Sequence, residues 1–315
     1  MKQTDSARAG SPFKIMLRAV VSLLVLALIA RSVDPGHAWD VLQRARWDLL
    51  ALALLMQFGS TAIAAYRWQL IMRNLKFGQT FSFYFRSYFK GMFFNQALPA
   101  SIGGDAVRVL DMAGRGFRKR DALYGVMVDR VTGLGALISL SLLAYLVRPD
   151  LLPAKVYYAI LAIFAAGAIG FSGLLLLSRT RWLDHNPRLA LLKSISTRLP
   201  QAFSAHRLQL LVSSLLIPLF ALLGFFATGW ALGLRYDLTT YFAIVPPAIV
   251  LTIIPVSIAG WGVREGALVG LFSLIGANKT TVLMMSLLYG LALIVVSLPG
   301  LVIFLKGHQR RPAKA

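Results

Sequence analysis

The chain has 315 residues, of which 57% are apolar and only 14% are charged. Basic residues outnumber acidic residues by 33 to 12, which gives a formal net charge of +21. One soluble globule cannot bury so much apolar surface, and the same excess excludes a disordered chain. The basic residues stand singly or in short groups between long apolar runs, which argues against a nucleic-acid-binding patch. The absence of cysteine excludes disulfides, thiolate metal ligands and cysteine nucleophiles. We therefore expect an all-α polytopic membrane protein.

Uncharged runs long enough to cross a bilayer recur along the chain, since a spanning helix needs about 20 mostly apolar residues. These runs cover residues 49–66, 131–147, 156–178, 208–234 and 280–305. A shorter run, 19–30, becomes a span if Arg18 and Arg31 extend to the two interfaces. The alternative for this run is a signal peptide, but no clean cleavage site follows it. The pattern predicts about six full spans.

Two further regions, 81–107 and 238–277, are apolar but interrupted. Irregular backbone at membrane depth is tolerated only where protein or a water-filled cavity covers it. We therefore expect each region to be a re-entrant broken-helix hairpin that returns to the side it entered. The helix-breaking residues are Pro99, Gly103 and Gly104 in the first region and Pro246, Pro247, Pro255, Gly260 and Gly262 in the second.

The distribution of basic residues predicts the orientation. With a cytoplasmic N-terminus and two hairpins, the inside segments carry a roughly threefold excess of Lys and Arg over the outside segments. We expect an integral plasma (inner) membrane protein with both termini cytoplasmic. Residues 1–305 form a single transmembrane domain in this interpretation, and 306–315 form a basic cytoplasmic tail. The basic inside loops are expected to contact anionic inner-leaflet lipids.

The two interrupted regions share a short sequence. Residues 99–108 are PASIGGDAVR and residues 255–264 are PVSIAGWGVR, with Pro, Ser, Ile, Gly, Val and Arg at matching positions. The predicted topology inserts the two copies from opposite sides, so they are related as an inverted repeat. Paired broken helices in inverted repeats are typical of alternating-access transporters, and their half-helix N-termini attract anions.

Six charged residues lie in or beside the apolar segments, where a charge is costly. They are Asp105, Arg108, Asp129, Arg130, Arg264 and Glu265. One interpretation is neutralisation, with Asp105 paired to Arg108 at i,i+3 and Arg264 paired to Asp129 or Glu265. The other is that Arg108 and Arg264 together hold an anionic group such as a phosphate, while Asp129 and Glu265 tune the site. The sequence leaves both open.

Other polar residues are candidates for the cavity wall, namely Ser101, Ser257, Asn95, Gln96 and Lys90. Their side chains are equally suited to form hydrogen bonds between helices. The four histidines fall in loops or tails without metal-ligand spacing, and no hydrolase, metalloprotease or P-loop motif occurs. We expect no metal and no cofactor.

Four sequence elements together resemble a known family. They are NQALPASIGGDAVR at 95–108, the Asp129-Arg130 pair, PVSIAGWGVREGA at 255–267 and LPG at 298–300. This combination resembles the transmembrane, flippase part of lysylphosphatidylglycerol synthetases over roughly residues 15–305. The resemblance implies movement of a lipid with a modified headgroup between leaflets, and it implies site roles for Arg108, Asp129, Arg130, Arg264 and Glu265. Because the synthetases carry a soluble aminoacyl-transferase domain after the membrane part, and this chain ends at Ala315, we do not expect it to synthesise aminoacyl lipid.

The expected function is that of a lipid flippase that moves an anionic phospholipid or a polyprenyl-phosphate-linked lipid. The expected partners are the substrate lipid and a lipid-modifying enzyme. Two alternatives belong to other classes. The first is a membrane-embedded enzyme acting on a lipid phosphate, with Asp105 or Asp129 as base. The second is a non-transporting partner of a membrane glycosyltransferase.

Overall fold

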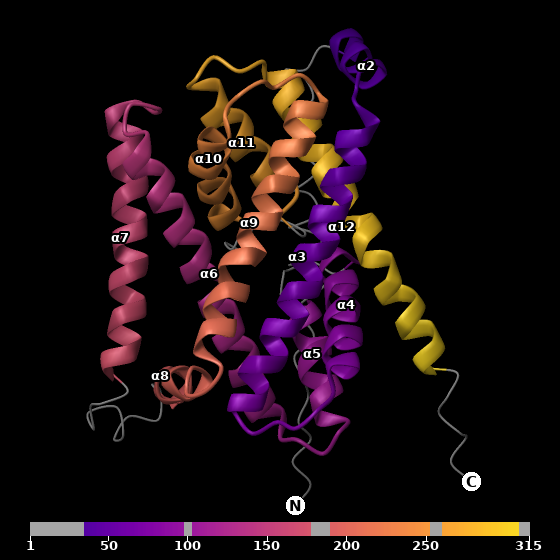
Figure 1. Cartoon of the computed structure of the whole chain (residues 1–315), viewed down its shortest axis with the longest axis vertical. Coiled ribbons are helices and arrows are strands. Elements are labelled where there is room, and N and C mark those ends of the chain that lie inside the picture. The colour runs from indigo at the N-terminus through magenta and orange to yellow at the C-terminus, as the bar shows by residue number, and fades with distance from the viewer. Residues whose placement is uncertain (1–34, 98–102, 178–189, 253–259, 309–315) are drawn as a thin grey trace, which may run out of the picture.

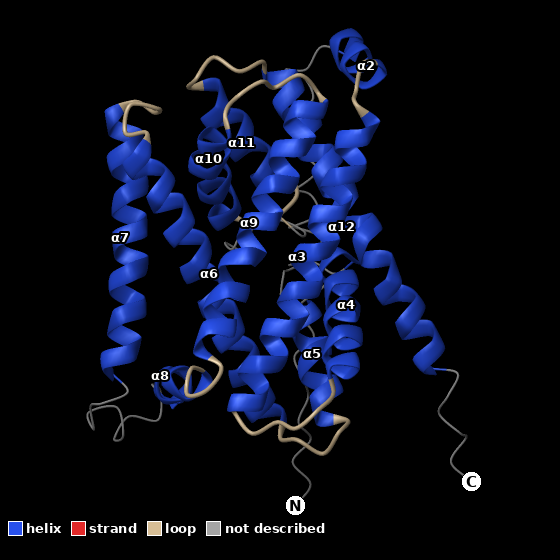
Figure 2. Ribbon diagram, viewed as in Figure 1, coloured by secondary structure: helices blue, strands red, loops and turns tan. Residues whose placement is uncertain are grey.

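The computed structural model describes residues 35–97, 103–177, 190–252 and 260–308. Within these residues the chain forms eleven helices and no strand (Figure 2). This confirms the all-α prediction for the described part of the chain. The predicted first span, 19–30, and most of the predicted tail, 306–315, lie outside the described residues.

In the described part of the chain, five helices are long and apolar enough to cross a membrane. They are α3 (Trp47–Asn74), α6 (Lys119–Val147), α7 (Ala154–Leu177), α9 (Arg207–Ala231) and α12 (Lys279–His308). Each contains all or nearly all of one of the long uncharged runs, so the expected spans at these positions form as helices. The helices α3 and α9 pack closely along each other at the centre of the bundle (Figure 1). The amphipathic helices α2 (Pro35–Gln43) and α8 (Ala190–Ala202) lie at opposite ends of the bundle.

Each interrupted region contains two short helices that pack on each other. The first region holds α4 (Phe81–Ala97) and the start of α5 (Gly103–Ala113), and the second holds α10 (Leu238–Leu251) and α11 (Val263–Ser273). The helix α5 thus continues beyond the predicted end at 107, and Gly103 and Gly104, predicted to break the helix, are its first two residues. In Figure 1, α4 and α5 occupy the lower half of the bundle, whereas α10 and α11 occupy the upper half. The chain between the helices of each pair, including Pro99 and Pro255, lies outside the described residues.

One predicted break is wrong. The helix α10 continues through Pro246 and Pro247, both of which are buried. A proline removes a backbone donor from a helix, and membrane helices tolerate this where neighbouring helices cover the freed groups. Here α10 packs against α6, α9 and α11. The helix ends instead after Leu251, with Thr252 as its C-cap.

Glycine has different uses in the two pairs. In the first pair it allows close contact, because a Cβ on Gly104 would lie 2.1 Å from the carbonyl oxygen of Gly91. In the second pair Gly260 and Gly262 have φ values of 81° and 85°, a conformation that excludes them from an α-helix. As a result Arg108 lies more than a turn into α5, whereas Arg264 lies in the first turn of α11.

The start of α10 depends on Asp237, which is its N-cap. The Asp237 carboxylate accepts the Thr240 backbone N–H at 2.9 Å and also accepts the Thr240 hydroxyl. We expect Asp237→Ala to destabilise the protein by about 1 kcal/mol, because an N-cap acceptor is lost. Thermal unfolding in detergent measures this change. The matched control is Asp150→Ala, since that carboxylate is 74% exposed and should change stability by less than about 0.5 kcal/mol.

The same variant should reveal a pH dependence. The hydrogen bond from Thr240, aided by the nearby Arg148, lowers the pKa of Asp237. The contribution of the cap is therefore present above the unfolded-state pKa of about 3.9 and is lost as the pH falls through the lower folded-state pKa. The difference in unfolding temperature between wild type and Asp237→Ala should narrow below about pH 4. A constant difference across that range would contradict this assignment of the cap.

Candidate functional site

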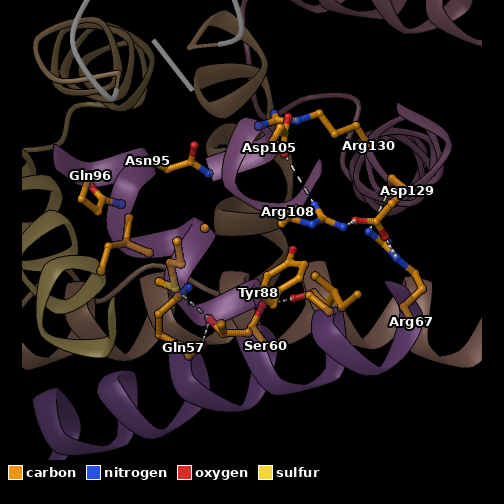
Figure 3. A pocket seen from close by; sticks show the side chains of 16 residues that line it. Gln57, Ser60, Arg67, Tyr88, Asn95, Gln96, Asp105, Arg108, Asp129 and Arg130 are labelled. Atoms are coloured by element: carbon orange, nitrogen blue, oxygen red, sulfur yellow. Dashed lines mark hydrogen bonds and ion pairs between the residues drawn. The ribbon is translucent and has the colours of Figure 1, made fainter. Parts of the chain in front are cut away.

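A cavity of about 310 Å³ lies where α4 and α5 meet α3 and α6, with one residue each from α9 and α12 closing it. Such a volume is at the lower end of those that hold small ligands. Figure 3 shows the side chains that line this cavity. Its polar wall is formed by Gln57, Ser60, Thr61, Arg67, Asn95, Gln96, Asp105, Arg108, Asp129 and Arg130.

The charged part of the wall is a continuous network of two carboxylates and three guanidinium groups. Asp129 accepts Arg67 Nε at 3.0 Å on one carboxylate oxygen and Arg108 Nη2 at 2.8 Å on the other. Arg108 Nη1 also lies 3.5 Å from Asp105 Oδ1, and Arg130 donates to the second oxygen of Asp105. The network confirms the predicted local pairing of Asp105 with Arg108. Its three cations and two anions leave a surplus of one positive charge; the Arg130 side chain is 37% exposed, whereas the other four charged groups are buried.

Aromatic rings fix the orientation of Arg108. Its guanidinium carbon lies 4.1 Å from the centroid of the Trp68 ring and 4.7 Å from that of Tyr88. A guanidinium over an aromatic face gains cation–π attraction, which increases when water is excluded. Arg108 is only 5% exposed. Its Nε and the Nη1 of Arg67 have no hydrogen-bond partner in the described part of the chain, so the network is not fully satisfied by the protein alone.

The neutral part of the wall joins several helices. Asn95 on α4 accepts the backbone N–H of Gly104 on α5 at 2.7 Å. Gln57 on α3 accepts the Tyr289 hydroxyl of α12 at 2.6 Å. Ser60 on α3 donates its hydroxyl to the Ile217 carbonyl of α9 at 2.9 Å. The first bond holds α4 and α5 together, and the other two join α3 to α12 and to α9 beside this pair.

A second charged cluster lies on α11 and α12. Arg264 donates to Glu265 Oε1 through Nη2 at 2.6 Å, and Ser286 of α12 donates to the same oxygen at 2.9 Å. The other Glu265 oxygen accepts the Gly262 N–H at 2.6 Å, which closes the N-terminus of α11. Arg264 and Glu265 do not belong to the cavity wall described above. Of the two partners that the sequence left open for Arg264, the structure selects Glu265.

The remaining sequence-predicted residues divide into three groups. Gln96 lines the cavity with Asn95. Lys90 does not, because it donates to Asp111 at 2.6 Å on the neighbouring α5. Ser101, Ser257, Pro99 and Pro255 lie outside the described residues. In the part of the chain that the structure describes, no group of three or more His, Asp or Glu side chains is placed to hold a metal ion.

Arg67 is a cavity residue that directly follows the uncharged run 49–66, so the sequence pattern places it in an inside loop. The helix α3 continues past the uncharged run to Asn74, so Arg67 lies inside it and is only 4% exposed. Gln57, Ser60, Ala64 and Arg67 recur at intervals of three or four residues, which places them on one helix face. This stripe of polar and small residues in an apolar helix is a signal that could have identified the α3 wall.

Comparison with known proteins agrees with this architecture. The family model described as the lysylphosphatidylglycerol synthase TM region matches residues 15–300. A curated relative, the UPF0104 membrane protein of Archaeoglobus fulgidus, is 29% identical over 116 residues. That alignment covers 37% of this chain and 35% of the relative, so the match spans about a third of each protein. Because the family model covers nearly the whole chain, the protein belongs to the lysylphosphatidylglycerol synthase transmembrane-region family.

Proposed function

We propose that the protein is a lipid translocase that moves a phosphate-bearing anionic headgroup between the two leaflets. The observation that carries this proposal is the surplus positive charge of Arg67, Arg108 and Arg130 over Asp105 and Asp129 in the cavity. A charge inside a membrane is costly and is retained where it serves function. Arginine suits this role because its planar fork binds phosphate oxygens through two hydrogen bonds.

The placement of the short helix pairs supports a transport cycle. Asn95, near the end of α4, and Asp105, in the first turn of α5, both line the cavity. The α10–α11 pair extends from the opposite end of the bundle (Figure 1). In our proposal the two pairs are an inverted repeat within one transmembrane domain of six spans, counting 19–30. Rocking of one repeat against the other then exposes the headgroup to each side in turn, while the lipid tail stays in the bilayer.

Arg264 takes the equivalent position in the second repeat of this proposal. Two residues of α12, one turn apart, connect it to the cavity: Ser286 bonds to Glu265, and Tyr289 bonds to Gln57. A shift of α12 would therefore act on both clusters together. We propose a plasma-membrane location with both termini cytoplasmic, and a lipid-modifying enzyme as the source of the substrate.

The pairing of both cavity carboxylates with arginines favours transport over an enzymatic reaction on a lipid phosphate. Asp129 is hydrogen-bonded to both Arg67 and Arg108, and Asp105 contacts both Arg108 and Arg130. A general base must be within reach of a substrate proton and able to accept it. Carboxylates that already accept from two guanidinium groups are poorly suited to that task.

Leaflet exchange in proteoliposomes tests the proposal. The full chain is reconstituted in phosphatidylcholine vesicles with fluorescent phosphatidylglycerol, phosphatidic acid or a polyprenyl phosphate, and dithionite bleaches the label in the outer leaflet. For at least one of these lipids, we expect the protein to move label from the inner to the outer leaflet, so that dithionite bleaches the label of both leaflets. Arg46→Gln should exchange lipid like wild type, because Arg46 is exposed and pairs only with Asp48. Rates equal to those of protein-free vesicles for every lipid would contradict the proposal.

A further inference from the structure

The cavity is divided into a charged half and a neutral half. In Figure 3 the arginines and aspartates lie on one side, whereas Gln57, Ser60, Asn95 and Gln96 lie on the other. The charged half accounts for a phosphate under the proposed function, on which the following inference rests. The neutral half must then face the part of the headgroup beyond the phosphate.

Asn95 presents a hydrogen-bond donor to this neutral half. Its Oδ1 accepts the Gly104 backbone N–H at 2.7 Å. A backbone N–H can only donate, so the oxygen and nitrogen of this amide are assigned without ambiguity. The Asn95 amide nitrogen has no hydrogen-bond partner among the described residues, although Asn95 lines the cavity. It is therefore available to a ligand as a donor.

Ser60 and Thr61 present acceptors to the same half. Their single hydroxyl protons are used, since Ser60 donates to the Ile217 carbonyl and Thr61 donates to the Gln57 carbonyl, both at 2.9 Å. Each hydroxyl oxygen keeps its lone pairs for an incoming donor. The neutral half thus offers donors and acceptors together, and a hydroxyl is the ligand group that uses both.

An amine-bearing headgroup does not fit this half. A buried ammonium needs a carboxylate partner or it pays a large desolvation cost. The two carboxylates in the described cavity wall, Asp105 and Asp129, are each already paired with two arginines. An added ammonium would also face the surplus positive charge of the arginine network. That surplus of one charge matches the single negative charge of a phosphodiester.

We propose that Gln57, Ser60, Thr61 and Asn95 form a hydroxyl-binding subsite. The substrate class is then a phosphodiester lipid whose headgroup carries hydroxyl groups, as in glycerol or a sugar, and not one that carries an amine. Two lipids share this chemistry, a phosphatidylglycerol and a polyprenyl phosphate linked to a sugar. Their different tails distinguish them in the experiment.

The test compares leaflet exchange of acyl-labelled phosphatidylglycerol and phosphatidylethanolamine in matched vesicles, with a labelled polyprenyl-phosphate sugar as a third arm. Wild type should move phosphatidylglycerol or the polyprenyl-phosphate sugar at least about tenfold faster than phosphatidylethanolamine, because only the hydroxyl headgroups satisfy the subsite. The faster of these two hydroxyl-bearing lipids identifies the source of the headgroup.

Asn95→Asp is the decisive variant. It keeps the oxygen that accepts the Gly104 N–H, but it replaces the free donor with a negatively charged oxygen. The ratio of phosphatidylglycerol to phosphatidylethanolamine rates should fall at least about tenfold, since the new carboxylate repels the phosphate and attracts an ammonium. Gln209→Glu adds the same charge at an exposed position of α9 and should leave the ratio unchanged. Ser60→Ala, a smaller change, should lower the ratio without adding charge.

The outcomes separate this inference from the proposed function. If wild type moves phosphatidylethanolamine as fast as the hydroxyl-bearing lipids, the subsite is refuted while translocation stands. An unchanged ratio in both Asn95→Asp and Ser60→Ala would refute it as well. If no lipid exchanges faster than in protein-free vesicles, the proposed function fails and the subsite fails with it.

Discussion

Asp129→Asn should destabilise the protein by about 3–5 kcal/mol, because it leaves buried guanidinium groups without their counter-charge. Asp129 is 2% exposed and binds Arg67 and Arg108 through separate carboxylate oxygens. Asparagine has nearly the same shape but no charge, and its amide nitrogen cannot accept a hydrogen bond from either arginine. The asparagine oxygen still accepts from one arginine, and the other arginine loses its side-chain acceptor at position 129. Arg67 would then be left with the backbone carbonyl of residue 129 at 3.1 Å, or Arg108 with Asp105 at 3.5 Å.

The measurement is thermal unfolding of purified protein in detergent, followed by tryptophan fluorescence, together with the yield of monodisperse protein. Asp150→Asn is the matched control, because its carboxylate is 74% exposed and lies 3.5 Å from Arg148, which also pairs with Asp237. The control should unfold within about 0.5 kcal/mol of wild type. An Asp129→Asn protein that unfolds at the wild-type temperature would show that the network does not hold α3, α5 and α6 together.

Arg108→Gln should have the opposite effect, because the protein should stay folded but lose lipid transport. After the substitution Asp129 still pairs with Arg67, and Asp105 still pairs with Arg130, so no carboxylate is left without an arginine. The glutamine side chain retains much of the packing of the arginine stem beside Gly91, although it loses the cation–π contact of the guanidinium with the Trp68 ring. The cavity loses its surplus positive charge, however. We expect the exchange rate of an anionic lipid to fall at least about tenfold, as loss of a charge-assisted hydrogen bond implies.

The long helices could be predicted from the sequence because composition over about 20 residues determines membrane insertion. The predicted breaks at Pro99 and Pro255 lie outside the described residues, but Gly260 and Gly262 have positive φ and precede α11, as expected where glycine acts on the backbone locally. Pro246 and Pro247 show the limit of this reasoning. Helices α6, α9 and α11 surround α10, so the missing backbone bonds do not end it.

The site could be predicted only where its contacts are local in sequence. Asp105 and Arg108 are neighbours on one helix face, and Arg264 and Glu265 are adjacent in the chain. The pairing of Arg108 with Asp129 joins α5 to α6, so it depends on packing that no spacing encodes. Arg67 was assigned to a loop because the uncharged run ends at Tyr66, whereas α3 continues for two more turns. A buried network permits a charge to lie inside a helix where hydropathy alone predicts its end.

The sequence likeness of the two short helix pairs does not extend to their local conformation. Gly104 lies inside α5 and contacts α4 closely, whereas the matching Gly260 adopts a positive φ and precedes α11. Arg108 therefore faces a cavity and Arg264 a compact cluster with Glu265 and Ser286. The proposed repeat thus carries two different sites in the conformation described here.

The most direct test of the central claim is the leaflet-exchange rate of phosphatidylglycerol in proteoliposomes that contain wild type, Arg108→Gln or Arg46→Gln protein at equal density. If the charged cavity binds the headgroup, wild type and Arg46→Gln should exchange the lipid fast. Arg108→Gln should exchange it at least about tenfold more slowly, while still unfolding cooperatively in detergent. Equal rates for wild type and a folded Arg108→Gln protein would contradict it.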